Sequence, residues 1–230
     1  MIDPAYIQSI VRILFAIVII TAAYIISTRN LLSVVSVYAL QSLTLVCIAL
    51  ALWSLEGTTV LLAIAVLTFV TKVLVIPYFI AAIQERVRIK RDIEFHYLSP
   101  TTSLLLSMGL MLVIYSALSR ILQGTPARES LFFFGAVLGI SLMLMGMMVT
   151  FSRKRAITKV LGYLSMENGV LLFGMFVTEL PFIIEFLIII DLIILVLLTT
   201  ILTVGIDSTL EDYHKRLHRF HLLEGMEETP

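Results

Sequence analysis

The sequence predicts an all-α integral membrane protein with seven transmembrane helices, and three observations lead to this fold class. First, 60% of the 230 residues are hydrophobic and 14% are charged, whereas a soluble domain carries about 25% charged residues. Second, polar breaks divide the chain into apolar runs of about 20 residues, the length that crosses a bilayer. Third, Lys and Arg gather in alternate loops. Lipid cannot satisfy open sheet edges, so a helical bundle is expected.

The apolar runs are separated by short polar breaks, and each run is long enough at 1.5 Å per residue to cross the hydrocarbon layer. We expect residues 84–100 and 120–130 to be polar loops and residues 207–230 to be a polar tail. The predicted spans are residues 5–27, 31–53, 58–83, 101–121, 131–151, 156–178 and 181–206.

The distribution of basic residues predicts the orientation, because cytoplasmic loops of membrane proteins are enriched in Lys and Arg. Loops on the opposite side hold only Arg120 and Arg128. The N-terminus is therefore expected outside and the C-terminal tail in the cytoplasm. One side collects Arg29, Arg86, Arg88, Lys90, Arg91, Arg153, Lys154, Arg155, Lys215, Arg216 and Arg219.

Several classes of function are disfavoured by what the chain contains. Its net charge is zero, so no basic surface indicates nucleic-acid binding. A single cysteine, Cys47, excludes an internal disulfide, a thiolate zinc site and an iron–sulfur cluster. His214, His218 and His221 would share one face of a helical tail, but an amphipathic partner-binding helix is the favoured interpretation. No phosphate loop, catalytic serine motif or haem-attachment motif occurs. We expect no catalytic site, cofactor or metal in this chain.

The first three and last three spans share a layout: a span entering the cytoplasm, a short turn that bears Arg, a returning span, a tight outer turn and a third span. Arg29 and Arg153 begin the corresponding turns. This layout predicts two three-helix units, residues 1–83 and 128–206, in parallel orientation. Residues 84–127 would supply a cytoplasmic loop, a linking helix and an outer loop.

Three ionisable residues lie deep within predicted spans. Glu167 is twelve residues from Arg155, about 18 Å along a helix, and Asp191 is ten residues from Pro181, about 15 Å. Lys72 lies inside the third span. An ionised side chain at the bilayer centre costs at least about 2.5–3.5 kcal/mol, so each needs a partner, a proton or water.

These residues support two interpretations. Burial disfavours the charged form of both acids and amines, which makes proton exchange available and predicts a proton path through Glu167, Asp191 and Lys72. The alternative is a static ion pair that fastens helices together. Glu185 lies nearer the interface and is a secondary candidate for the path. Arg12 and Lys159 are also near the interface, where snorkelling and a structural role are expected.

Two further features concern helix geometry. Pro77 removes the backbone hydrogen bond to Val73, which frees a carbonyl one residue from Lys72 and favours a kinked, locally polar helix. A tolerated transmembrane proline is the alternative. Gly135 and Gly139 form a GxxxG pattern, which predicts a close helix contact.

The segment from Gly162 to Gly169 (GYLSMENG), preceded by Arg153-Lys154-Arg155, resembles the K-type, chain 4L-like, subunit of complex I. The seven-span length and the Met-Glu-Asn-Gly segment resemble more closely component E of hydrogenase-4 and related membrane-bound [NiFe]-hydrogenase or formate hydrogenlyase complexes. K-type subunits have three spans, an external N-terminus and buried glutamates in spans two and three.

The resemblance also bears on individual residues. The family's span-two glutamate falls at Leu164, and Glu167 lies three residues later on nearly the same helix face. In the first unit, Gln41 stands near the corresponding place and Lys72 in the third span. The proton-path role is therefore carried over to Glu167 first, then to Asp191 and Lys72, with Gln41 as a secondary candidate.

Together these observations predict a non-redox accessory subunit of a hydrogenase complex in a prokaryotic plasma membrane. Its partners would be antiporter-like and quinone-subunit-like chains and, through them, a [NiFe]-hydrogenase module. The alternatives are a purely structural bridge and the small subunit of a multisubunit cation/proton antiporter. If Glu167 faced acyl chains or had no protonatable neighbour, the bridge would be preferred.

Overall fold

The computed structural model describes residues 4–28, 30–87, 99–121, 131–153, 156–177, 188–197 and 199–200, and every regular element in these ranges is helical. Side chains are described for most of these residues. The elements, in chain order, are α1 (Pro4–Ser27), α2 (Leu31–Glu56), α3 (Thr59–Thr68), the π-helical segment η1 (Phe69–Val75), α4 (Ile76–Val87), α5 (Pro100–Ile121), α6 (Leu131–Ser152), α7 (Ala156–Val177) and a shorter helix, Ile188–Leu197.

Five helices in the described part of the chain are long and apolar enough to cross a membrane, which agrees with a membrane-embedded protein. The seventh predicted span, residues 181–206, contains the helix Ile188–Leu197 and is described only in part. The count of seven spans and the division into two units therefore remain predictions. The five helices are Ala5–Ser27, Leu31–Glu56, Thr59–Ala82, Pro100–Ile121 and Leu131–Ser152.

Helix boundaries fall close to the predicted ones, and local chemistry explains where α2 begins and ends. The side chain of Asn30 accepts a hydrogen bond from the Leu32 amide at 3.2 Å, which caps the N-terminus. Gly57, at φ 68°, ends the helix in a left-handed conformation and donates to the Trp53 carbonyl at 2.8 Å. The predicted third span ends at 83, whereas α4 continues to Val87 because the polar residues that follow the apolar run still favour a helix.

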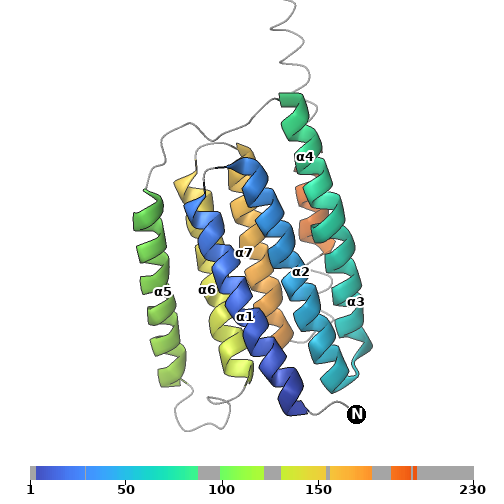
Figure 1. Ribbon diagram of the computed structural model, residues 1–230, viewed down its shortest axis with the longest axis vertical. Helices are drawn as coiled ribbons and strands as arrows, with labels where there is room; N and C mark the ends of the chain where they lie inside the picture. The colour runs from blue at the N-terminus through green and yellow to red at the C-terminus, as the bar shows by residue number, and fades with distance from the viewer. Residues whose placement is uncertain are drawn as a thin grey trace, which may run out of the picture.

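The helices form one bundle in which α6 and α7 pack extensively against each other (Figure 1). At one edge α5 packs against α6, and α1 crosses in front of the pair and contacts both α6 and α5. On the other side of α1 lies α2, which contacts α1 and α7. The continuous helix formed by α3, η1 and α4 packs against α2 at the opposite edge from α5. This arrangement brings α2, η1 and α7 together in the interior.

The α6–α7 interface is built on glycine, as the GxxxG pattern predicts. A methyl group at Gly139 would lie 2.5 Å from the backbone nitrogen of Phe173, so only hydrogen fits there. Gly146 and Gly169 face backbone atoms of the partner helix in the same way, at Met166 and Met143. The two helix backbones therefore touch directly, and the predicted close contact is confirmed.

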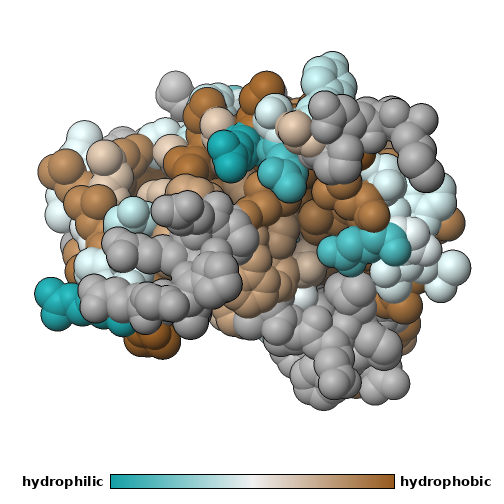
Figure 2. Space-filling view, turned by 90° about the horizontal axis from the view of Figure 1, so that it is seen from below, coloured by the Kyte–Doolittle hydropathy of each residue, from teal (hydrophilic) through white to brown (hydrophobic). Residues whose placement is uncertain are grey.

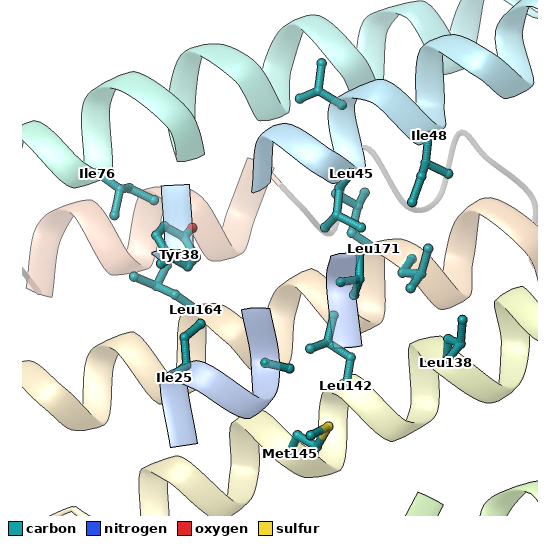
Figure 3. Packing of buried hydrophobic residues seen from close by; sticks show 14 of the residues in the cluster. Ile25, Tyr38, Leu45, Ile48, Ile76, Leu138, Leu142, Met145, Leu164 and Leu171 are labelled. Atoms are coloured by element: carbon teal, nitrogen blue, oxygen red, sulfur yellow. The ribbon is translucent and has the colours of Figure 1, made fainter. Parts of the chain in front are cut away.

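Apolar residues cover much of the outside of the bundle, and the interior holds both apolar and polar side chains. Ile13, Leu112 and Phe151 are each more than 60% exposed, and the end-on view of Figure 2 shows apolar residues over much of the described surface. Aliphatic side chains also fill the core, where Tyr38 lies near Ile76 and Leu164 (Figure 3). Exposed apolar surface of this extent is typical of a protein whose solvent is lipid.

Arg153 joins α6 to α1 at one end of the bundle. Its side chain is buried although it belongs to the basic cluster predicted to be cytoplasmic. Its guanidinium Nη2 donates to the carbonyls of Ile25, Ile26 and Thr28 at 3.2, 3.3 and 2.6 Å. A cation at the C-terminus of α1 is favourable because the last carbonyls of a helix lack partners. The end of α6 is thereby fixed to the end of α1.

Candidate functional site

The centre of the candidate site is an ion pair buried between η1 and α7. Lys72 Nζ lies 2.8 Å from Glu167 Oε1, and the exposed fractions of the two side chains are 0% and 2%. The pair joins residues 95 positions apart in the sequence, so two spans that are remote in the chain meet here. Neighbouring helices cover both side chains, and direct pairing is how two buried charges are tolerated.

Amides and hydroxyls extend this pair toward α2 and α1. The Lys72 ammonium donates to Asn168 Oδ1 at 3.4 Å. Asn168 in turn donates to Gln41 Oε1 at 3.2 Å and to Ser42 Oγ at 3.1 Å. Ser165 also donates to Gln41 Oε1, at 3.2 Å. Gln41 is thus a fully buried acceptor for two groups of α7.

The far end of this chain of contacts is Thr21 on α1. Gln41 Nε2 donates to Thr21 Oγ1 at 3.5 Å, and the Thr21 hydroxyl donates to the Val18 carbonyl at 2.8 Å. Contacts between polar side chains therefore run without interruption from Glu167 through Lys72, Asn168 and Gln41 to α1. We call Asn168, Gln41, Thr21, Ser42 and Ser165 the amide arm.

Asp191 stands on the other side of the ion pair, on the helix Ile188–Leu197. It is 7% exposed, and its Oδ2 lies 2.8 Å from the Thr71 hydroxyl of η1. The same hydroxyl lies 2.9 Å from the Leu67 carbonyl. Because a threonine hydroxyl has one hydrogen, it donates fully to only one of these oxygens. When it donates to Leu67, a protonated Asp191 can donate to it.

Asp191, Glu167 and the buried phenol of Tyr38 lie in the same region of the bundle interior. Asp191 Oδ1 has no hydrogen-bond partner among the described residues. Asp191 and Thr71 also line an open pocket of about 210 Å³ whose other walls are aliphatic. We call Lys72, Glu167, Asp191 and Thr71 the charged cluster.

The π-helical segment η1 determines which side chains enter the cluster. The Ile76 amide bonds to the Thr71 carbonyl, five residues back, in place of the four-residue spacing of an α-helix. Pro77 follows directly and has no amide hydrogen for the Val73 carbonyl. The wider turn lies at Lys72 itself, so the predicted irregularity near Pro77 takes the form of a π-helix.

The structure brings the predicted path residues Glu167, Asp191 and Lys72 together, and places Gln41 two contacts away. Glu185 lies outside the described residues, as do the three tail histidines. Arg12 and Lys159 are exposed and contribute nothing to the cluster. Glu167 faces the bundle interior and has two protonatable neighbours, so the condition set for abandoning a proton path is not met.

Sequence reasoning missed Asn168, Thr71 and Tyr38. Asn168 follows Glu167 directly, and an amide in a predicted span needs a hydrogen-bond partner as an acid does. Thr71 precedes Lys72, but threonine is common in transmembrane helices, where it bonds to its own backbone. Nothing in the local pattern distinguishes Tyr38 from an ordinary core aromatic residue.

In chemical terms the charged cluster combines one ammonium with two carboxyl groups. If both acids were ionised, the buried cluster would carry a net negative charge, and one bound proton would make it neutral. No family model matches the chain, and neither a curated protein nor a solved structure matches it.

Proposed function

We propose that this chain is a non-redox membrane subunit that handles protons through Glu167, Lys72 and Asp191. The observation that carries the proposal is the buried cluster of two acids and one amine, each supplied by a different segment. In this proposal the cluster binds one proton, because two carboxylates and one ammonium together carry one excess negative charge. The proton can move between the two carboxyl groups, since either of them can hold it.

We further propose that the subunit serves a complex I-like membrane-bound hydrogenase of a prokaryotic plasma membrane, with its N-terminus outside. The support is the resemblance of the segment from Gly162 to Gly169, together with the basic loops. In this assembly, antiporter-like and quinone-subunit-like chains would flank it, and a [NiFe] module would supply the electron transfer. The chain itself would then contribute charge movement and assembly of the membrane arm.

The proton-handling proposal is tested with Glu167→Gln, which keeps the shape of the side chain and removes its acid. In inverted membrane vesicles that contain the assembled complex, we expect hydrogen-linked proton translocation to fall at least about tenfold. Glu56→Gln is the matched control, because Glu56 is an exposed acid at the end of α2. Glu167→Asp, which retains the acid, should restore part of the activity.

The contrary result is an assembled Glu167→Gln complex that translocates protons at the wild-type rate. It would favour the structural bridge, for which there is also a specific observation: the Lys72–Glu167 pair is short and fully buried, as a permanent fastening between helices would be. Assembly is measured in the same membranes by co-purification of the complex.

The identity of the complex is tested separately, by purifying the tagged chain from its native membranes in a mild detergent. Recovery of a [NiFe] subunit with antiporter-like chains supports the hydrogenase proposal. Recovery of antiporter subunits alone would instead assign the chain to a cation/proton antiporter. This outcome would leave the proton-handling proposal standing, because that depends only on the cluster.

A further inference from the structure

A second feature lies away from the charged cluster, where α7 faces the helix Ile188–Leu197. These elements enclose a groove of about 250 Å³ whose lining includes Lys159, Tyr163, Ile194 and Leu197. Lys159 and Tyr163 are four residues apart on α7 and so share one face of that helix. The groove is independent of the proposed proton chemistry, because none of its lining residues belongs to the charged cluster or the amide arm.

Lys159 supplies a cation to this groove. Lys159 is exposed, and no acid pairs with its ammonium among the residues that the structure describes. It is the fourth residue of α7, at the end of the helix where the dipole favours an anion. Lys154 and Arg155 immediately precede the helix in the sequence. An anion beside Lys159 would interact favourably with its ammonium and with the helix dipole.

The rest of the groove is apolar. Ile193, Ile194 and Leu197 line it from the neighbouring helix, while Tyr163 supplies the type of side chain that is enriched at membrane interfaces. The groove therefore offers aliphatic surface to a hydrocarbon chain and a cation to an anionic group.

We propose that this groove binds an anionic phospholipid, with the headgroup phosphate at Lys159 and an acyl chain along Ile193, Ile194 and Leu197. Basic residues at the end of a groove between transmembrane helices are the arrangement by which membrane proteins recognise acidic headgroups. Tyr163 lines the same groove one helical turn from the lysine.

The experiment uses the full-length chain in phosphatidylcholine vesicles that contain a photoactivatable phosphatidylglycerol with its reactive group on the acyl chain. Peptide mapping should find the label in residues 188–197. Unlabelled phosphatidylglycerol should displace it, whereas added phosphatidylcholine and glycerol phosphate should not. Equal displacement by phosphatidylcholine would overturn the proposal, because it would show unselective lipid contact. Displacement by glycerol phosphate would show a phosphate site that needs no lipid chain.

Variants locate the headgroup. Lys159→Gln should lower the selective labelling several-fold, and Lys159→Arg should retain it. Arg12→Gln is the matched control, since Arg12 is also an exposed cation in a helix but does not line the groove. Unchanged labelling of the Lys159→Gln chain would contradict the proposal. Absence of labelling in the wild-type chain would also contradict it and would favour a partner protein at this face.

Discussion

The two faces of α7 are packed in opposite ways. Toward α6, glycines bring the backbones into direct contact, and a single added carbon at Gly139 has no room. Toward η1, the helices are joined by side chains: an ion pair at 2.8 Å and an amide contact at 3.4 Å from the same ammonium. Glu167 thus stands on a helix that is held closely on one side and joined by polar groups on the other.

The difference indicates how a buried polar site is held in position. Close backbone packing fixes α7 with little freedom, since helix interfaces of small residues maximise van der Waals contact. The opposite wall contains a π-helical turn, a geometry that occurs frequently at functional sites. Any rearrangement of the cluster is therefore expected on the η1 side and not at α6.

The largest effect is expected from breaking the ion pair on one side only. Glu167→Leu leaves the Lys72 ammonium buried without its partner and should destabilise the chain by about 3–5 kcal/mol. Lys72→Met should cost less, because the remaining carboxyl groups can take up a proton. The measurement is unfolding of the purified chain in detergent micelles.

The double variant Lys72→Met with Glu167→Leu is the control for this prediction. Replacing both charges by apolar groups of similar size should recover most of the lost stability, because no unpaired charge remains. A double variant as unstable as the sum of the two single variants would mean that the pair is not energetically coupled.

A smaller effect is expected on the tightly packed face. Gly139→Ala places a methyl group against the Phe173 backbone and should destabilise the chain by about 1–3 kcal/mol. Gly109→Ala on α5 is the matched control, since no described atom beyond its own stretch of helix lies within 4 Å of the added carbon. It should be neutral or stabilising by up to about 1 kcal/mol, from helix propensity. Equal effects of the two substitutions would refute direct backbone contact as the basis of this interface.

The smallest effect is expected from Thr71→Val, which removes one hydrogen bond at the edge of the cluster. The loss should be about 1 kcal/mol, the range measured for hydrogen bonds between transmembrane helices. Thr44→Val is the comparison, because among the described residues the Thr44 hydroxyl donates to the Leu40 carbonyl of its own helix, at 2.8 Å, and to no other group. If both variants lose the same stability, the contact between Thr71 and Asp191 contributes nothing of its own.

Much of the fold could be predicted because lipid imposes simple rules on a chain. Run length located six helical stretches to within a few residues, and the GxxxG pattern located the contact between α6 and α7. Counting residues along spans predicted Glu167, Asp191 and Lys72 deep in the membrane; the structure shows all three side chains buried, and their depth in the bilayer stays a prediction. Each of these predictions depends on local sequence and on the bilayer thickness, which are both known beforehand.

The pairing of those residues could not be predicted in the same way. Which acid meets Lys72 depends on how the helices are arranged around α2 and on the rotation of η1. The π-helical turn changes that rotation, and the sequence marks it only through Pro77. The roles of Asn168 and Gln41 depend on the same arrangement, because the hydrogen-bond partners of a side-chain amide can be assigned only when the neighbouring helix is known.

The separation of Lys72 and Glu167 along the chain has a consequence for biogenesis. The ribosome makes residue 167 after a further 95 residues, which takes roughly 5 to 20 seconds at cellular rates of synthesis. During that interval the third hydrophobic segment carries an unmatched lysine, whose insertion costs about 2.5–3.5 kcal/mol at the bilayer centre. We therefore expect that segment to remain at the translocon, or bound to an insertase, until α7 has been synthesised.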